Sequence, residues 1–186
     1  MPDRPNRPTA DLEAVETAMA LLLDATDGLT DEQARGASRL PGWTRGHVLT
    51  HIARNADAFA FAIDGAVRGE EVHMYPGGDE QRTRDIEAGA GRPVDELRAD
   101  LAASQRHLDD AWARVEGDTW DREFRPIVGK RTVEGSIAVR RREILVHLVD
   151  LAFGVAPGDL PADYLERDGE YLRANRTRET WPDAPW

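Results

Sequence analysis

Four stretches of this chain repeat their apolar residues at steps of three and four, which is the period of a helix that buries one face. They cover residues 11–25, 45 to about 67, 93 to about 115, and from 132 or 136 to 153. No run alternates with the two-residue period of a strand. Since long amphipathic helices bury their apolar faces against one another, we predict an all-α fold, an antiparallel four-helix bundle with short accessory helices.

Several residues mark where these helices begin and end. Thr30 followed by Gln33 predicts a capping box that opens a short helix, and Thr44 is a good N-cap for the second long helix. Pro93 suits the first turn of the third. Gly154 is expected to cap the last one.

The remaining segments are shorter or more polar. We expect short helices over residues 82–90 and 161–165, and extended or irregular structure over residues 120–127. Residues 173–186 are polar and contain prolines, so they are expected to lie on the surface or to be disordered. With 186 residues, of which 40% are hydrophobic, one core is favoured: a bundle over residues 1–160, then a short helix and tail over 161–186.

The charge and the cysteine count exclude several classes of function. A formal net charge of −11 would repel nucleic-acid phosphates and anionic membrane surfaces. No apolar stretch is long enough for a signal peptide or a membrane span, so we expect a cytoplasmic protein. Because the chain has no cysteine, any thiol that takes part in its chemistry must come from outside.

Three residues form a candidate metal site. Glu143 and His147 lie four apart, so on a helix both point to one face and could hold a single ion. His51 lies on the apolar side of another predicted helix. Two imidazoles and a carboxylate suit a borderline metal such as zinc and leave a coordination position open, which favours catalysis over a structural role.

Each of these residues also has a simpler interpretation. A Glu and a His four apart are often a solvated surface pair, but this pair lies in and beside the apolar run of residues 144–149 (ILVHLV). His47 and His51 form an alternative pair of ligands, although we favour a role for His47 in capping or in supporting the site. Asp150 either orients the ring of His147 or is an ordinary surface acid.

Residues 40–57 (LPGWTRGHVLTHIARNAD) closely resemble the opening motif of the mycothiol-dependent maleylpyruvate isomerase N-terminal domain family, in the DinB-like superfamily. Residues 74–78 (MYPGG), 84–92 (RDIEAGAGR) and 141–151 (RREILVHLVDL) agree with it. The resemblance spans roughly residues 10 to 160.

The resemblance implies a four-helix bundle with a divalent metal, usually zinc, on a His, Glu and His triad. Those ligands fall on His51, Glu143 and His147, the same residues that the spacing indicates. It also implies mycothiol as the thiol cosubstrate. The isomerases of this family carry a further C-terminal domain, which we expect to be absent because the chain stops at Trp186.

The sequence therefore predicts a metal-dependent enzyme, a monomer or homodimer, that activates a small thiol for S-transfer or for isomerisation of a small electrophile. Asn55, Arg82 and Arg84 are candidates to hold the substrate. Two alternatives remain at this point: a hydrolase or lyase that uses metal-bound water, and a non-catalytic binding or stress-response module.

Overall fold

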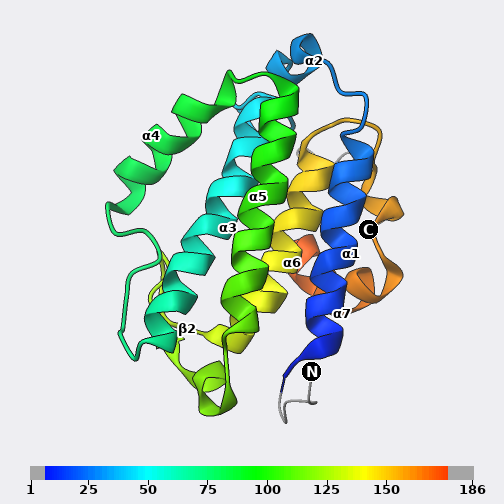
Figure 1. The fold of residues 1–186 in the computed structure, drawn as a ribbon. Coiled ribbons are helices and arrows are strands. Elements are labelled where there is room, and N and C mark those ends of the chain that lie inside the picture. The colour runs from blue at the N-terminus through cyan, green and yellow to red at the C-terminus, as the bar shows by residue number, and fades with distance from the viewer. Residues whose placement is uncertain (1–6, 176–186) are drawn as a thin grey trace.

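The structure, a computed structural model, describes residues 7–175. Four long helices lie side by side in it (Figure 1), as the periodicity of the sequence predicted, and they confirm the all-α, DinB-like bundle. They are α1 (Thr9–Ala25), α3 (Arg45–Val67), α5 (Val94–Ala113) and α6 (Val133–Asp150). The shorter helices are α2 (Asp31–Arg35), α4 (Gly78–Ala90), α7 (Ala162–Asn175) and the 3-10 turns η1 (Gly117–Asp121) and η2 (Pro157–Asp159).

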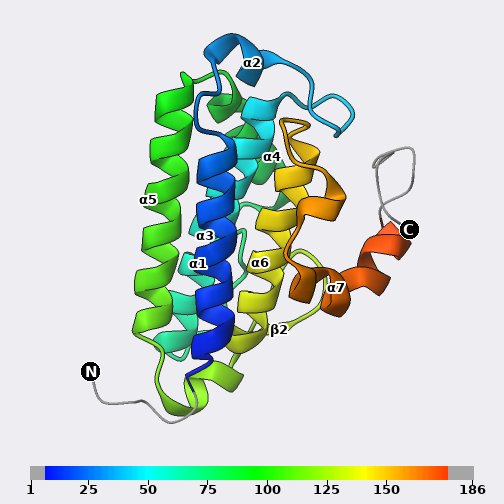
Figure 2. The same ribbon diagram turned by 90° about the vertical axis from the view of Figure 1, so that its right-hand side faces the viewer.

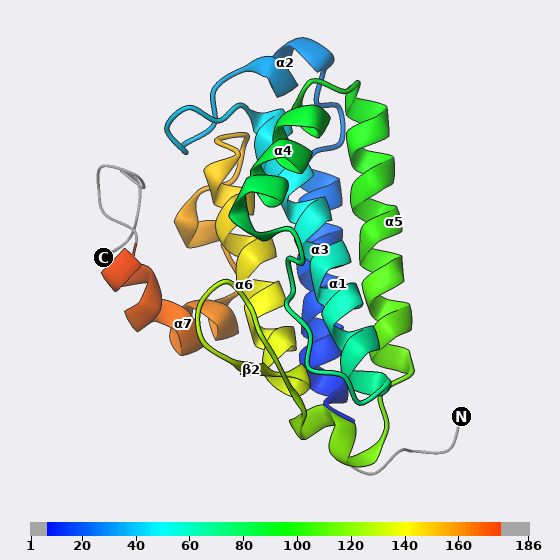
Figure 3. The same cartoon turned by 90° about the vertical axis from the view of Figure 1, so that its left-hand side faces the viewer.

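The directions of the helices differ in one respect from a simple antiparallel bundle. α3 and α5 run parallel, because Arg54 contacts Asp100 near their beginnings and Asp64 contacts Arg114 near their ends. The helix between them, α4, crosses back along the bundle and returns the chain to the end where α3 began (Figure 3). The crossover lets α3 lie between α4, α5 and α6.

α3 is the most enclosed helix of the bundle. Small residues at Ala53, Ala56 and Ala60 are almost fully buried and allow its neighbours to approach closely. Since the helix is covered on several faces, the polar side chains of His51 and Asn55 are also enclosed. A polar group in such a place requires partners, and α6 supplies them.

Some of the predicted helix ends are confirmed and others are not. The capping box predicted at Thr30 forms, and Thr44 is the N-cap of α3 as predicted, with His47 completing a second capping box there. Pro93 lies one position before α5 instead of in its first turn. The cap predicted at Gly154 is wrong, because α6 ends at Asp150 and Ala152 already has a left-handed backbone, with φ of 51°. Its carbonyl oxygen accepts a hydrogen bond from Arg45 Nη2 at 2.9 Å.

Two segments carry more structure than the sequence indicated. α7 continues to Asn175, well past the predicted end at Leu165, and it packs beside α6 (Figure 2). Residues 173–175, which were predicted to belong to a tail, are therefore part of α7, and the rest of that prediction, residues 176–186, lies outside the described residues. The connection after α5 contains an antiparallel hairpin of β1 (Glu123–Phe124) and β2 (Arg131–Thr132). In the described part of the chain, no helix combines the length and the hydrophobicity that crossing a membrane requires.

One glycine allows α4 to pack closely on α3. A Cβ atom at Gly46 would lie 2.1 Å from the carbonyl oxygen of Ala90, at the end of α4. Backbone at that distance cannot move aside without moving the helix. Gly46 therefore helps to set the position of α4 over α3.

We expect Gly46→Ala to lower the free energy of unfolding by about 2 kcal/mol, because the added methyl group overpacks this contact. Urea unfolding of the purified variant measures it. Gly91→Ala is the matched control, since a Cβ there meets nothing within 4 Å, and it should change stability by less than about 0.5 kcal/mol. Equal effects of the two substitutions would contradict this account of the helix contact.

Candidate metal centre

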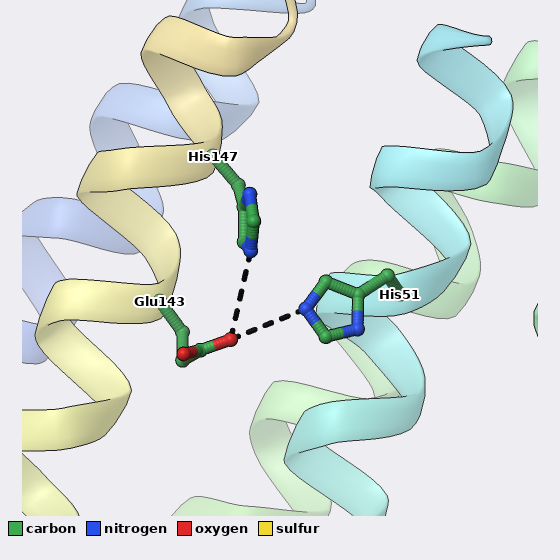
Figure 4. Close-up of side chains that lie close together, drawn as sticks. All are labelled: His51, Glu143 and His147. Carbon is green, nitrogen blue, oxygen red and sulfur yellow. Dashed lines mark hydrogen bonds and ion pairs between the residues drawn. The ribbon is translucent and has the colours of Figure 1, made fainter. Parts of the chain in front are cut away.

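His51 from α3 and the pair Glu143 and His147 from α6 face one another across the bundle (Figure 4). One possible ligand atom from each lies within 4.8 Å of the other two. The Oε2 atom of Glu143 is 3.2 Å from His51 Nε2 and 3.6 Å from His147 Nε2. The structure thus brings together the three side chains that were predicted to share an ion.

Asp150 supports His147 from behind. Its Oδ2 atom lies 2.9 Å from His147 Nδ1, and its side chain is buried. The bond leaves the Nε2 atom of His147 directed at Glu143. A carboxylate on the far nitrogen is the arrangement that orients metal-binding histidines, and it was one of the two interpretations that the sequence left open.

The environment drives the two histidines to opposite charge states. Burial lowers the pKa of His51 to about 4. Burial alone would also lower the pKa of His147, but hydrogen bonds to Asp150 and Glu143 outweigh it and raise that pKa to about 9. Burial opposes ionisation of Glu143, yet its bonds to both histidines hold its pKa well below the usual value. Without a metal, neutral pH therefore leaves His51 neutral, His147 protonated and Glu143 ionised.

A cavity of about 560 Å³ opens beside the three side chains, a size typical of small-molecule sites. Arg82 Nη2 lies 3.2 Å from His51 Nδ1, and the guanidinium carbon lies 5.9 Å from the centre of the Tyr75 ring. Burial raises the pKa of Tyr75, and the side chains of Arg82 and Asn55 beside its hydroxyl oppose that rise. Other residues that line the cavity are Leu40, Trp43, Phe59, Met74, Pro126, Ile127, Val128, Arg131, Val139 and Tyr171.

A fully buried arginine holds Asn55 in place. Arg140 Nη1 donates to Asn55 Oδ1 at 2.9 Å and to the carbonyl oxygen of Ile52 at 2.8 Å. Its Nε donates to Gln105 Oε1 at 3.0 Å. Burial lowers the pKa of Arg140 to about 10, so the group stays charged at neutral pH. It thereby fixes the amide of Asn55 through its oxygen, at a position that lines the cavity.

Two of the candidate residues lie elsewhere. His47 serves the capping box, where its Nδ1 accepts from the backbone N–H of Thr44 at 3.2 Å, and its Nε2 lies 3.2 Å from Glu87. Arg84 is exposed, 3.8 Å from Glu80, and does not line the cavity. Residues two apart on a helix point in nearly opposite directions, so α4 directs only one of its two candidate arginines inward.

Tyr75, Arg131 and Tyr171 also line the cavity, although the sequence assigned none of them a role there. Tyr75 was signalled by its place in the MYPGG motif, but no role was assigned to it. Arg131 lies on the short hairpin and Tyr171 on α7, two elements that the periodicity did not predict correctly.

The helical order, with α4 as a crossover and the His, Glu and His cluster between α3 and α6, defines a DinB-like bundle. Residues 15–152 match the family described as Mycothiol maleylpyruvate isomerase N-terminal domain, and the chain belongs to that family. A search of curated proteins found no match.

Two solved structures are similar: the crystal structure of the mycothiol-dependent maleylpyruvate isomerase, and that of a variant with a histidine replaced by alanine. Each has a TM-score of 0.79 and 28% sequence identity, over 85% of this chain. The chain spans 66% of the length of that enzyme.

We expect the free energy of unfolding of the metal-free protein to be highest near pH 6.5. As the pH rises from 6.5 toward 9, His147 loses the proton that its raised pKa retains in the folded state, and the stability from its two hydrogen bonds is lost. As the pH falls from 6.5 toward 4, His51 becomes protonated in the unfolded chain, whereas its lowered pKa keeps it neutral in the folded protein. Proton binding then favours the unfolded chain, so the free energy of unfolding falls again.

Urea unfolding in the presence of a chelator, at a series of pH values, measures this curve. His147→Gln should remove the decline above pH 6.5, and the exposed His107→Gln should leave the curve unchanged. Constant stability of the unaltered protein between pH 6.5 and 9 would show that His147 is not held in its charged form.

Proposed function

We propose that this chain is a metal-dependent enzyme that activates a small thiol, mycothiol, for S-transfer to a small electrophile or for its thiol-assisted isomerisation. The observation that carries the proposal is the cluster of His51, Glu143 and His147, which opens onto a cavity in a member of this family. The thiol is suggested by the name of the family and by the name of the similar enzyme.

The donor set fits a divalent ion, and zinc fits best. Two imidazole nitrogens and a carboxylate oxygen are the ligands of many catalytic zinc sites, which keep one position open. His51 is neutral at pH 7 because of its lowered pKa, and Asp150 orients His147. When bound here, such an ion would lower the pKa of a coordinated thiol, so that the thiolate forms at neutral pH.

The chain has no cysteine, so the nucleophilic sulfur must belong to the cosubstrate. In isomerisation, the thiolate sulfur adds to one carbon of an activated double bond, the resulting single bond rotates, and elimination restores the double bond and releases the thiolate. Asn55 and Tyr75 border the space in which this would happen. Their roles are to donate hydrogen bonds to polar groups of the reactants and to exclude water.

Two arginines favour an anionic electrophile. Among the residues that the structure describes, neither Arg82 nor Arg131 forms an ion pair with a carboxylate, and both line the cavity. Many of the other arginines are paired, as Arg54 and Arg92 are with Asp100. Guanidinium groups bind carboxylates through paired hydrogen bonds. Arg82 and Arg131 are therefore the residues that we assign to a substrate carboxylate.

The purified protein is expected to hold one divalent ion per chain by elemental analysis and to consume mycothiol in the presence of a suitable electrophile. A chelator should abolish the consumption and zinc should restore it. His51→Ala removes one of three ligands and should lower both metal content and rate, the rate by about 100-fold or more. His107→Ala, an exposed histidine on α5, is the control.

Full metal occupancy of His51→Ala would overturn the ligand assignment. Hydrolysis without thiol consumption would instead support the use of metal-bound water. Protein that binds no divalent ion would support a non-catalytic binding module.

Arg82→Ala should raise KM for a carboxylate-bearing electrophile by about 10- to 100-fold, because it removes charged hydrogen bonds to that group. Arg84→Ala lies two residues away on the solvent side of α4 and should change KM by less than about twofold. Metal content of both variants should equal that of the unaltered protein. A similar KM for the two variants would exclude Arg82 from substrate binding.

A further inference from the structure

Two consecutive arginines of α6 attach α7 to the bundle, and each uses a carboxylate and a tyrosine ring. Arg141 donates two hydrogen bonds to the carboxylate of Asp163, at 2.7 and 3.0 Å. Its guanidinium carbon also lies 5.7 Å from the centre of the Tyr164 ring, which is fully buried. This pair anchors the first turn of α7.

The second attachment lies beside the metal centre. Arg142 immediately precedes Glu143, and its Nε donates to Asp168 Oδ1 at 3.0 Å, while Nη2 contacts the same oxygen. Its guanidinium carbon lies 4.0 Å from the centre of the Tyr171 ring, within the range of a cation–π contact. Asp168 is only 5% exposed, so the carboxylate of this attachment is shielded from water.

The second attachment places the Tyr171 ring in the wall of the cavity that contains His51 and Glu143. Tyr171 is 40% exposed, and it shares the wall with Ile127 and Val128, which are 53% and 83% exposed. Figure 3 shows the hairpin loop and α7 on the same side of α6. Exposed apolar side chains grouped at the mouth of a cavity are typical of binding surfaces.

The cavity therefore has two chemically different parts. Arg82 and Arg131 supply positive charge, and Tyr171 with the hairpin tip supplies apolar surface. A ligand that satisfies both carries a carboxylate and an apolar body. The ring costs little entropy to order, because its guanidinium support already holds it in the free protein.

We propose that Tyr171 is a specificity-determining residue that packs against the apolar body of a carboxylate electrophile and selects it over smaller acids. The residue lies on α7, beyond the residues 15–152 that match the family, so the selection would belong to this chain's own segment. The inference rests on the proposed function in taking this cavity as the substrate site.

Binding of simple carboxylates to the zinc-loaded protein tests the assignment without any thiol. Acetate and hexanoate share the charged group and differ in the apolar part, so the ratio of their dissociation constants isolates the contact with the wall. Isothermal titration would measure both on the unaltered protein, Tyr171→Ala, Tyr171→Phe and Glu170→Ala. Glu170 is the neighbouring exposed residue of α7 and is not part of the cavity.

The unaltered protein should bind hexanoate more tightly than acetate. Tyr171→Ala should weaken hexanoate binding by about tenfold and acetate binding by less than about twofold, because only the longer acid reaches the ring. Tyr171→Phe keeps the ring and should keep the preference, and Glu170→Ala should not alter either constant.

An unchanged preference in Tyr171→Ala would overturn the proposal, as would a protein that shows no preference for hexanoate. An equal loss in Glu170→Ala would also overturn it, since it would indicate a general disturbance of α7. Failure of the proposed function gives a different result: mycothiol is not consumed, while the dependence of hexanoate binding on Tyr171 remains.

Discussion

An ionised glutamate between two imidazoles is the interaction on which the rest of this structure depends. Removing a carboxylate from water is costly unless opposite charge and hydrogen bonds replace the water. Protonated His147 supplies the charge here, and Asp150 stabilises that protonated form. Arg140 adds a second, fully buried positive charge one turn away on the same helix. In the proposed function, a divalent cation would take over the role of the proton on His147, and the charges that stabilise the metal-free protein would then stabilise the bound ion.

The bundle is arranged to make this interaction possible. The crossover through α4 encloses α3 on several sides, so the side chains of His51 and Asn55 are buried. Their hydrogen-bond partners lie on α6. The same crossover carries Arg82 over the far nitrogen of His51. Attachment of α7 through Arg142 then closes another side of the cavity, directly beside Glu143. Arg82 and Arg142 thus both hold helices on the bundle and shape the cavity.

The sequence was sufficient to predict that Glu143 and His147 lie together at the candidate metal site, because a local rule identifies such a pair. Residues four apart on a helix share a face, and a charged pair within an apolar helix needs a partner. The rule failed where the chain gives no such local signal. Arg84 was grouped with Arg82 although α4 directs it to solvent. Arg131 was missed because a two-residue strand leaves little periodicity to detect. Tyr171 was missed because the last helix was predicted to end at Leu165, although α7 continues to Asn175.

The sequence by itself determined that this chain has no cysteine and which residue types are present for the site. It also determined the helical class and the capping box at Thr30, because these depend on neighbours within about one turn of helix. Only the tertiary structure decided that His51 lies 3.2 Å from a carboxylate 92 residues later in the chain. It alone also decided that α3 and α5 run parallel and that Tyr171 reaches the cavity. These depend on how whole helices pack, and packing is decided by the complementary shapes of faces that are far apart in sequence.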